Sequence, residues 1–70
     1  MPIILAPINR DLRIVRIAAD ERTKKHLENL GINVNGSITV LSSSGGAVVV
    51  LVKDGRIALD RSLSTKIFVA

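Results

Sequence analysis

Residues 23–36, TKKHLENLGINVNG, predict the last turns of a short helix, its end and a return to extended chain. Leu27 and Leu30 share one face of this helix because they lie three residues apart. Gly31 follows where a helix commonly ends on a residue with positive φ, a conformation that glycine adopts without a Cβ clash. With Gly31 at C′, Leu27 falls at C3 and Ile32 at C″, two positions whose side chains are commonly in contact. The stop therefore sets how the helix packs against the chain that follows.

A second turn follows at once, at Asn35 and Gly36. Both are residue types that accept left-handed backbone conformations. Upstream, Asp20 is suited to cap the start of the helix, because its carboxylate can accept a hydrogen bond from the first turn. The sequence thus predicts a helix over residues 20–30. A helix of about ten residues is marginal alone, so it must be held by the rest of the fold.

The composition describes a small aliphatic domain. The 70 residues are 47% apolar, with Phe68 as the one aromatic residue, so the core must consist of valine, isoleucine and leucine. We expect a single domain over residues 1–70 with a small core, because short chains bury a small share of their surface. The absence of cysteine fits a reducing compartment. No apolar run approaches a membrane span of about 20 residues, and the opening residues do not form a secretory signal, so we expect neither membrane insertion nor export.

Five segments predict short β-strands, because their apolar residues alternate with polar ones or form β-branched runs: residues 11–18, 37–42, 47–52, 56–59 and 66–69. In the first segment the alternation slips, which a bulge near Val15 and Arg16 explains. The third segment is continuously apolar, which indicates a strand packed on both faces. Asp54 and Gly55 suit a tight hairpin turn between the third and fourth segments.

The connecting segments complete the predicted architecture. Residues 1–9 contain two prolines and predict either an edge strand or an apolar strap over the core. Residues 42–46, SSSGG, predict a flexible loop, and Asp60 can cap a single helical turn before the last strand. The sum is a mainly β protein: a small antiparallel barrel of about five strands, with one α-helix between the first and second.

The side chains offer little for catalysis or metal binding. The only histidine is His26, and the nearest carboxylate in sequence, Glu28, faces away from it on a helix. Ser62, Ser64 and Thr65 have no neighbouring base to activate them. One histidine without cysteine cannot assemble a soft tetrahedral metal site. We therefore predict a protein that is not an enzyme, with no catalytic residues, no metal ligands and no cofactor.

The net charge of +4 permits an acidic partner. Basic residues gather along the first half of the chain: Arg10, Arg13, Arg16, Arg22, Lys24 and Lys25. The near absence of aromatic residues argues against nucleic acid, because single-strand and RNA modules stack bases on aromatic side chains. Basic groups beside exposed aliphatics such as Leu41 and Leu51 indicate a protein–protein contact instead. The alternative, that the strap or the helix buries these leucines, stays open.

The order and spacing of several motifs resemble the FeoA family, ferrous iron transport protein A, over nearly the whole chain. The matching segments are LRIVRI at 12–17, LENLGI at 27–32, GSITV at 36–40, GAVVV at 46–50, GRIAL at 55–59 and LSTKIFV at 63–69. The chain departs from the family at Val34-Asn35, where Pro-Gly is usual, and at Ser64, where alanine is usual. The resemblance implies an SH3-like barrel with one α-helix between the first and second strands and a short helical turn before the last.

The resemblance further implies a bacterial, cytoplasmic accessory protein of ferrous iron uptake. Its implied partner is FeoB, a membrane permease with a GTPase domain, which it would bind and modulate. Iron-dependent repressors carry a similar SH3-like domain attached to a DNA-reading helix-turn-helix. This chain has no such reader, so the transport accessory is favoured, with the repressor-type domain and a basic nucleic-acid-binding barrel as alternatives.

We expect a monomer whose partner-binding residues lie on or beside the helix: Arg16, Lys24, Lys25, Leu27 and Leu30. The alternative is that Leu27 and Leu30 simply belong to the core. The expected turn residues are Gly31, Asn35, Gly36 and Gly55. An arginine could also assist GTP hydrolysis by the partner, as arginine fingers do, with Arg13, Arg16 and Arg56 as candidates.

Overall fold

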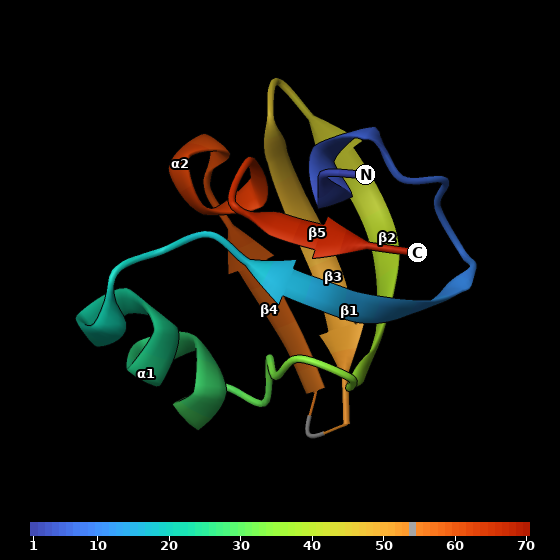
Figure 1. Cartoon of the computed structure of the whole chain (residues 1–70). Helices are drawn as coiled ribbons and strands as arrows, with labels where there is room; N and C mark the ends of the chain where they lie inside the picture. The colour runs from blue at the N-terminus through green and yellow to red at the C-terminus, as the bar shows by residue number, and fades with distance from the viewer. Residues whose placement is uncertain (54) are drawn as a thin grey trace.

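Five antiparallel strands form one sheet in the order β4-β3-β2-β1-β5, which curls into a barrel-like shape (Figure 1). The computed structural model describes residues 1–53 and 55–70. Its elements are η1 (Ile3–Leu5), β1 (Asp11–Ile17), α1 (Glu21–Asn29), β2 (Ser37–Ser44), β3 (Ala47–Val52), β4 (Gly55–Leu59), α2 (Arg61–Ser64) and β5 (Ile67–Val69). The predicted class is confirmed: mainly β, with a helix between the first two strands and a helical turn before the last. The sheet stays open between β4 and β5.

β1 pairs with two neighbouring strands, β2 and β5, and contains a bulge at Val15. Its first part pairs with β2, and its second part pairs with β5, where Arg16 lies opposite Phe68. The register shifts between Ile14 and Arg16, so the bulge predicted near Val15 and Arg16 is confirmed. A bulge bends its strand and increases the local twist, which fits the curvature of the sheet.

The core is aliphatic, as the composition predicts. Every strand contributes to it, together with η1, α1 and the loop that follows α1. The buried apolar residues are Ile3, Ile14, Ile17, Leu27, Ile32, Ile38, Val40, Val48, Val50, Val52, Leu59, Ile67 and Val69. Phe68 is only half-buried, so the core forms without an aromatic side chain at its centre.

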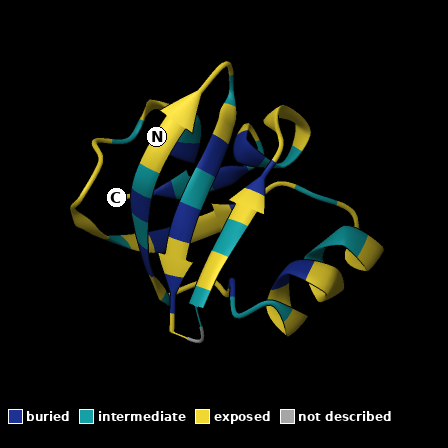
Figure 2. Ribbon diagram, turned by 180° about the vertical axis from the view of Figure 1, so that it is seen from behind, coloured by how far each residue is buried: buried dark blue, intermediate teal, exposed yellow. Residues whose placement is uncertain are grey.

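β3 is buried on one face only. Val48, Val50 and Val52 are buried, whereas Ala47 and Leu51 are exposed. The prediction of a strand packed on both faces is therefore wrong. The sheet is a single curved layer, so alternate side chains of an interior strand still reach solvent. Figure 2 shows the same alternation of buried and exposed positions along the strands.

The SSSGG segment is a hairpin, and the prediction of a flexible loop is wrong. β2 continues to Ser44, which lies opposite Ala47. Gly45 and Gly46 make the turn, with φ of +58° and +89°. Positive φ at both central residues matches the right-handed twist of the strands, and Gly-Gly is a strong sequence signal for such a turn. The serines join the strand because backbone pairing with β3 does not depend on an apolar side chain.

Residues 1–9 form the predicted strap rather than an edge strand. Ile3, in η1, is fully buried. The Met1 amino group donates to the Val69 carbonyl at 2.9 Å, and the Val69 N–H donates to the Met1 carbonyl at 2.8 Å. Pro2 forms an isolated bridge with Phe68. The segment therefore covers the outer edge of β5.

Both helices begin at an aspartate cap. The Asp20 carboxylate accepts a hydrogen bond from the Thr23 N–H at 2.8 Å, and Asp60 accepts one from the Leu63 N–H at 2.9 Å. Each bond satisfies a backbone donor that has no partner within its helix. The start at Asp20 and the single turn capped by Asp60 are confirmed.

α1 ends in a Schellman motif. The Ile32 N–H donates to the Leu27 carbonyl at 2.9 Å, and the Gly31 N–H donates to the Glu28 carbonyl at 3.0 Å. Gly31 has a φ of +93°, and both Leu27 and Ile32 are fully buried. These are the bonds and the apolar pair that define the motif. The end of the helix is thus fastened to the core.

The next turn joins the loop after α1 to β1. The Asn35 N–H donates to the Ile14 carbonyl at 2.7 Å, and the Ile14 N–H donates to the Gly36 carbonyl at 2.9 Å. Asn35 has a φ of +72°. Gly36 is needed for space, because a Cβ there would lie 3.0 Å from the Asn33 carbonyl oxygen. Of the predicted hairpin pair, Gly55 has a φ of +138°, and Asp54 lies outside the described residues.

Acid should weaken the start of α1 through Asp20. Hydrogen bonds from the Thr23 side chain and its backbone N–H lower the pKa of Asp20, and Lys66 adds a smaller effect in the same direction. A carboxyl group with a lowered folded pKa stabilises the protein above its unfolded pKa, and this contribution is lost as pH falls through the folded pKa. Asp20→Asn keeps the cap acceptor without the charge. It should flatten the acid limb of thermal stability, measured by circular dichroism from about pH 6 downward; identical profiles for the two proteins would contradict the assignment.

Candidate protein-binding surface

The helix residues expected to bind a partner differ in exposure. α1 lies at the side of the barrel (Figure 1). Lys25 is exposed, and Lys24 and Leu30 are half-buried. Leu27 is the buried residue of α1 and has no exposed surface. Leu27 therefore supports this surface by holding the helix in place, while Lys24, Lys25 and Leu30 can be reached by a partner.

Arg16 lies on β1 and is exposed. Its guanidinium carbon lies 4.4 Å from the centroid of the Phe68 ring, across the β1–β5 pair. This distance is typical of a cation–π contact, which favours a cation over the ring face. The structure thus gives Arg16 a defined position over the Phe68 ring of β5.

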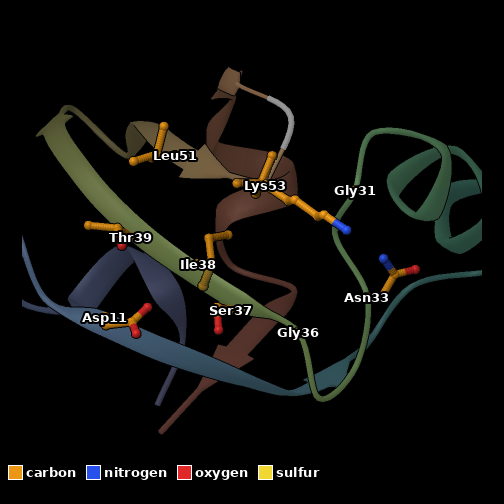
Figure 3. A pocket seen from close by; sticks show the side chains of 10 residues that line it. Asp11, Gly31, Asn33, Gly36, Ser37, Ile38, Thr39, Leu51 and Lys53 are labelled. Atoms are coloured by element: carbon orange, nitrogen blue, oxygen red, sulfur yellow. The ribbon is translucent and has the colours of Figure 1, made fainter.

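A groove that the sequence analysis did not predict lies between the loop after α1 and the strands β2 and β3 (Figure 3). Its volume is about 460 Å³. The lining residues are Asp11, Gly31, Asn33, Gly36, Ser37, Ile38, Thr39, Leu51, Val52 and Lys53. Leu51 supplies its most accessible apolar side chain, with 42% of its surface exposed.

Opposite charges stand at two sides of this groove. Asp11 extends from β1, and Lys53 reaches from the end of β3 toward the backbone at Gly31 (Figure 3). Asp11 lies opposite Thr39, and Thr39 lies opposite Leu51, so the three form one row across three strands. Directly opposed residues of antiparallel strands project to the same face. Leu51 therefore lies on the same face as Asp11, with Thr39 between them, and Lys53 lines another side of the groove. This combination of an apolar side chain with an acid and a base suits a protein segment of mixed character.

Glycine backbone forms part of one wall of the groove. Gly31 and Gly36 carry no side chain that could fill the space, and the chain reverses direction at each of them. The signal for this surface in the sequence was Leu51, which was expected to be an exposed aliphatic side chain. Leu51 is exposed, whereas Leu41 is half-buried. The groove itself depends on bringing the loop beside β3, which the sequence pattern did not reveal.

The side chains considered for catalysis or metal binding either have structural roles or do not gather into a site within the described residues. The Ser64 hydroxyl donates to the Gly46 carbonyl at 2.6 Å and the Arg61 carbonyl at 3.2 Å, so it pins α2 to the β2–β3 turn. His26 is exposed on α1. Within residues 1–53 and 55–70, no three His, Cys, Asp or Glu side chains gather as a metal group. No helix in this part of the chain is long and apolar enough to span a membrane.

A curved five-stranded sheet with a peripheral helix and an apolar groove defines a small SH3-like domain. The family model described as "FeoA domain" matches residues 1–70, so the chain belongs to the FeoA domain family. This family of small accessory domains is linked to ferrous iron uptake and is not a known enzyme family. A comparison with curated protein sequences finds no match.

Solved structures share the fold at low identity. The crystal structure of an iron uptake regulatory protein (FeoA) is 20% identical, with a TM-score of 0.88 over 99% of this chain and 93% of that one. The FeoA protein from Chlorobium tepidum is 17% identical, with a TM-score of 0.85 over 99% of this chain and 68% of that one. A manganese-dependent transcriptional repressor is 18% identical, with a TM-score of 0.88 over 100% of this chain but 40% of the repressor. At such identities the likeness establishes the fold alone.

Proposed function

We propose that this domain is a cytoplasmic, non-enzymatic accessory of ferrous iron uptake. It binds a FeoB-like membrane permease through the permease's GTPase region and modulates it. Membership of the FeoA domain family supports the link to iron uptake. The observation that carries the binding role is the apolar groove, about 460 Å³ in volume, with Leu51 exposed inside it. Apolar pockets bordered by polar and charged groups are typical of protein contacts.

The groove adjoins the C-terminal end of α1. Gly31 lines the groove and directly follows Leu30 in the chain. Lys24 and Lys25 lie on the same helix. A partner seated in the groove and extending along α1 would reach these cations, and an acidic patch on it would be attracted to them. Leu27 holds the helix in position, and Arg16 offers a separate contact on the β1–β5 face.

Charge reversal on the helix tests this docking surface. The double variant Lys24→Glu, Lys25→Glu should weaken binding to the purified GTPase region of a FeoB-like permease by about tenfold at low salt. The loss should shrink as salt rises, because salt screens exposed charges. Isothermal titration calorimetry measures both. The charge-matched control Arg10→Glu, Arg61→Glu changes two exposed arginines that lie outside α1. If the helix variant stays folded and binds as tightly as the control, docking through the basic helix is excluded.

Modulation is tested in a separate assay. The rate of GTP hydrolysis by the permease, measured with and without saturating domain, should change when the domain is bound. The candidates to assist hydrolysis are Arg13, Arg16 and Arg56. Arg13 and Arg56 are exposed, and Arg16 is held over Phe68. Replacing each in turn shows whether any of them affects the hydrolysis rate. Unchanged hydrolysis at full occupancy would limit the domain to docking.

A second candidate is a domain of the metal-dependent repressor type. The observation in its favour is the TM-score of 0.88 with the manganese-dependent repressor, of which this chain spans 40%. The SH3-like domain of such a repressor is attached to the DNA reader and is not the reader itself, so this candidate predicts no binding to the permease in the calorimetric titration and no binding to duplex DNA by the domain alone. An affinity for DNA that falls steeply with salt would instead favour the basic nucleic-acid-binding barrel, because such a domain releases counterions from the phosphates.

A further inference from the structure

β4 is the free edge of the sheet. At the opposite margin, Met1 and Pro2 cover β5 through backbone contacts with Val69 and Phe68. β4 pairs with β3 alone. Within residues 1–53 and 55–70, no backbone hydrogen bond joins β4 to any other segment. Figure 2 shows β4 as the last strand on its side of the sheet.

The register identifies which backbone groups of β4 point outward. In an antiparallel pair, hydrogen-bonded and non-hydrogen-bonded residue pairs alternate, and a two-residue loop is flanked by a hydrogen-bonded pair. Val52 lies opposite Gly55 with two residues between them. The N–H and C=O groups of Gly55, Ile57 and Leu59 therefore face β3. Those of Arg56 and Ala58 face away from it.

The β2–β3 hairpin gives the same alternation independently. Its flanking pair is Ser44 and Ala47, so the backbone groups of Ala47 face β2 and those of Val48 face β4. Val48 lies opposite Leu59, which agrees with Leu59 facing β3. Two turns thus assign the outward positions to Arg56 and Ala58, and both residues are exposed.

We propose that β4 accepts an extended acidic segment of a partner protein as an additional strand. Main-chain hydrogen bonds to an exposed sheet edge are a common mode of peptide recognition. Arg56 projects to the outer face beside Leu51, so it should pair with an aspartate or glutamate of the added strand. Ile57 is half-buried on the inner face and should be covered by an apolar side chain. This inference rests on the proposed function in that the partner is the permease.

Charge favours an acidic partner over a second copy of the chain. Each copy carries a net charge of +4, so two copies repel each other. Edge-to-edge pairing would also bring the two Arg56 side chains close together, and like charges near each other across strands are destabilising. An acidic strand replaces that repulsion with an ion pair. The same arginine therefore protects the edge against self-association, as charged residues on edge strands commonly do.

Amide hydrogen exchange with a designed probe tests the proposal. The probe is a short blocked peptide in which valine and glutamate alternate, and its control carries lysine in place of glutamate. The glutamate peptide should slow exchange of the Arg56 and Ala58 amides by about tenfold at saturation, while the lysine peptide leaves them unchanged. Arg56→Glu should reverse this preference. Ala58→Pro removes an outward donor, which edge strands tolerate, and should abolish protection at Arg56.

Three outcomes overturn the proposal. One is unchanged exchange with the glutamate peptide, and another is an Arg56→Glu variant that keeps the original preference. A third is slow exchange without peptide together with a dimer mass in sedimentation, which would assign the edge to a second copy. Permease binding that survives Ala58→Pro removes the edge from the interface but leaves the proposed function intact. Protection by the peptide without any permease binding would keep β4 as an acceptor of an added strand and would contradict the proposed function.

Discussion

Leu27→Ala should lower the free energy of unfolding by about 2–4 kcal/mol, because it removes a fully buried side chain and leaves a cavity. Leu27 is the buried residue of α1, and its carbonyl accepts the closing bond of the Schellman motif. A chain of 70 residues has a total stability of only about 4–10 kcal/mol. The variant should therefore sit close to the threshold of folding, with α1 released from the sheet.

The matched control for Leu27 is Leu30→Ala, on the same helix and of the same chemistry. Leu30 is half-buried. Leu30→Ala should therefore lower the free energy of unfolding by roughly half as much or less, because Leu30 buries less apolar surface on folding than Leu27 does. Urea unfolding followed by circular dichroism gives both free energies. Hydrogen exchange should show faster exchange in α1 than in the sheet for Leu27→Ala. Equal costs for the two variants would show that Leu27 does not anchor the helix.

Leu51→Asp should weaken binding to the permease GTPase region by about thirtyfold, the loss of one apolar anchor of about 2 kcal/mol. The side chain is 42% exposed and lines the groove. An aspartate there would bring a second carboxylate near Asp11, in the same row of the sheet. It would also place a carboxylate where a partner's apolar group is expected to pack, and the carboxylate loses its water there. The loss should therefore exceed that caused by reversing the lysines of α1.

The control for the groove is Leu5→Asp. Leu5 is 71% exposed and is not among the groove residues, so this change should leave the affinity unaltered. Both variants should keep the thermal stability of the parent protein within a few degrees, because neither side chain belongs to the core. Calorimetric titration gives the affinities and circular dichroism the melting midpoints. Equal binding by the two variants would exclude the groove as the docking site.

Local chemistry was enough to predict much of this fold. Asp20 as a cap and Gly31 as a stop are signals confined to a few neighbouring residues, and the helix they predicted agrees with α1 to within about one residue at each end. The slipped alternation around Val15 predicted the bulge in β1. The aliphatic composition predicted a core without an aromatic centre. In each case the cause lies within a single segment.

Features that depend on contacts between distant segments were not predicted. Burial of β3 on one face, the hairpin at Gly45 and Gly46, the groove beside Leu51 and the free edge at β4 all follow from which strands pair and in what register. An apolar run looks the same whether one or both of its faces are covered. A groove requires two segments to stop short of contact. Such arrangements are set by packing across the whole sheet, which no short stretch of residues encodes.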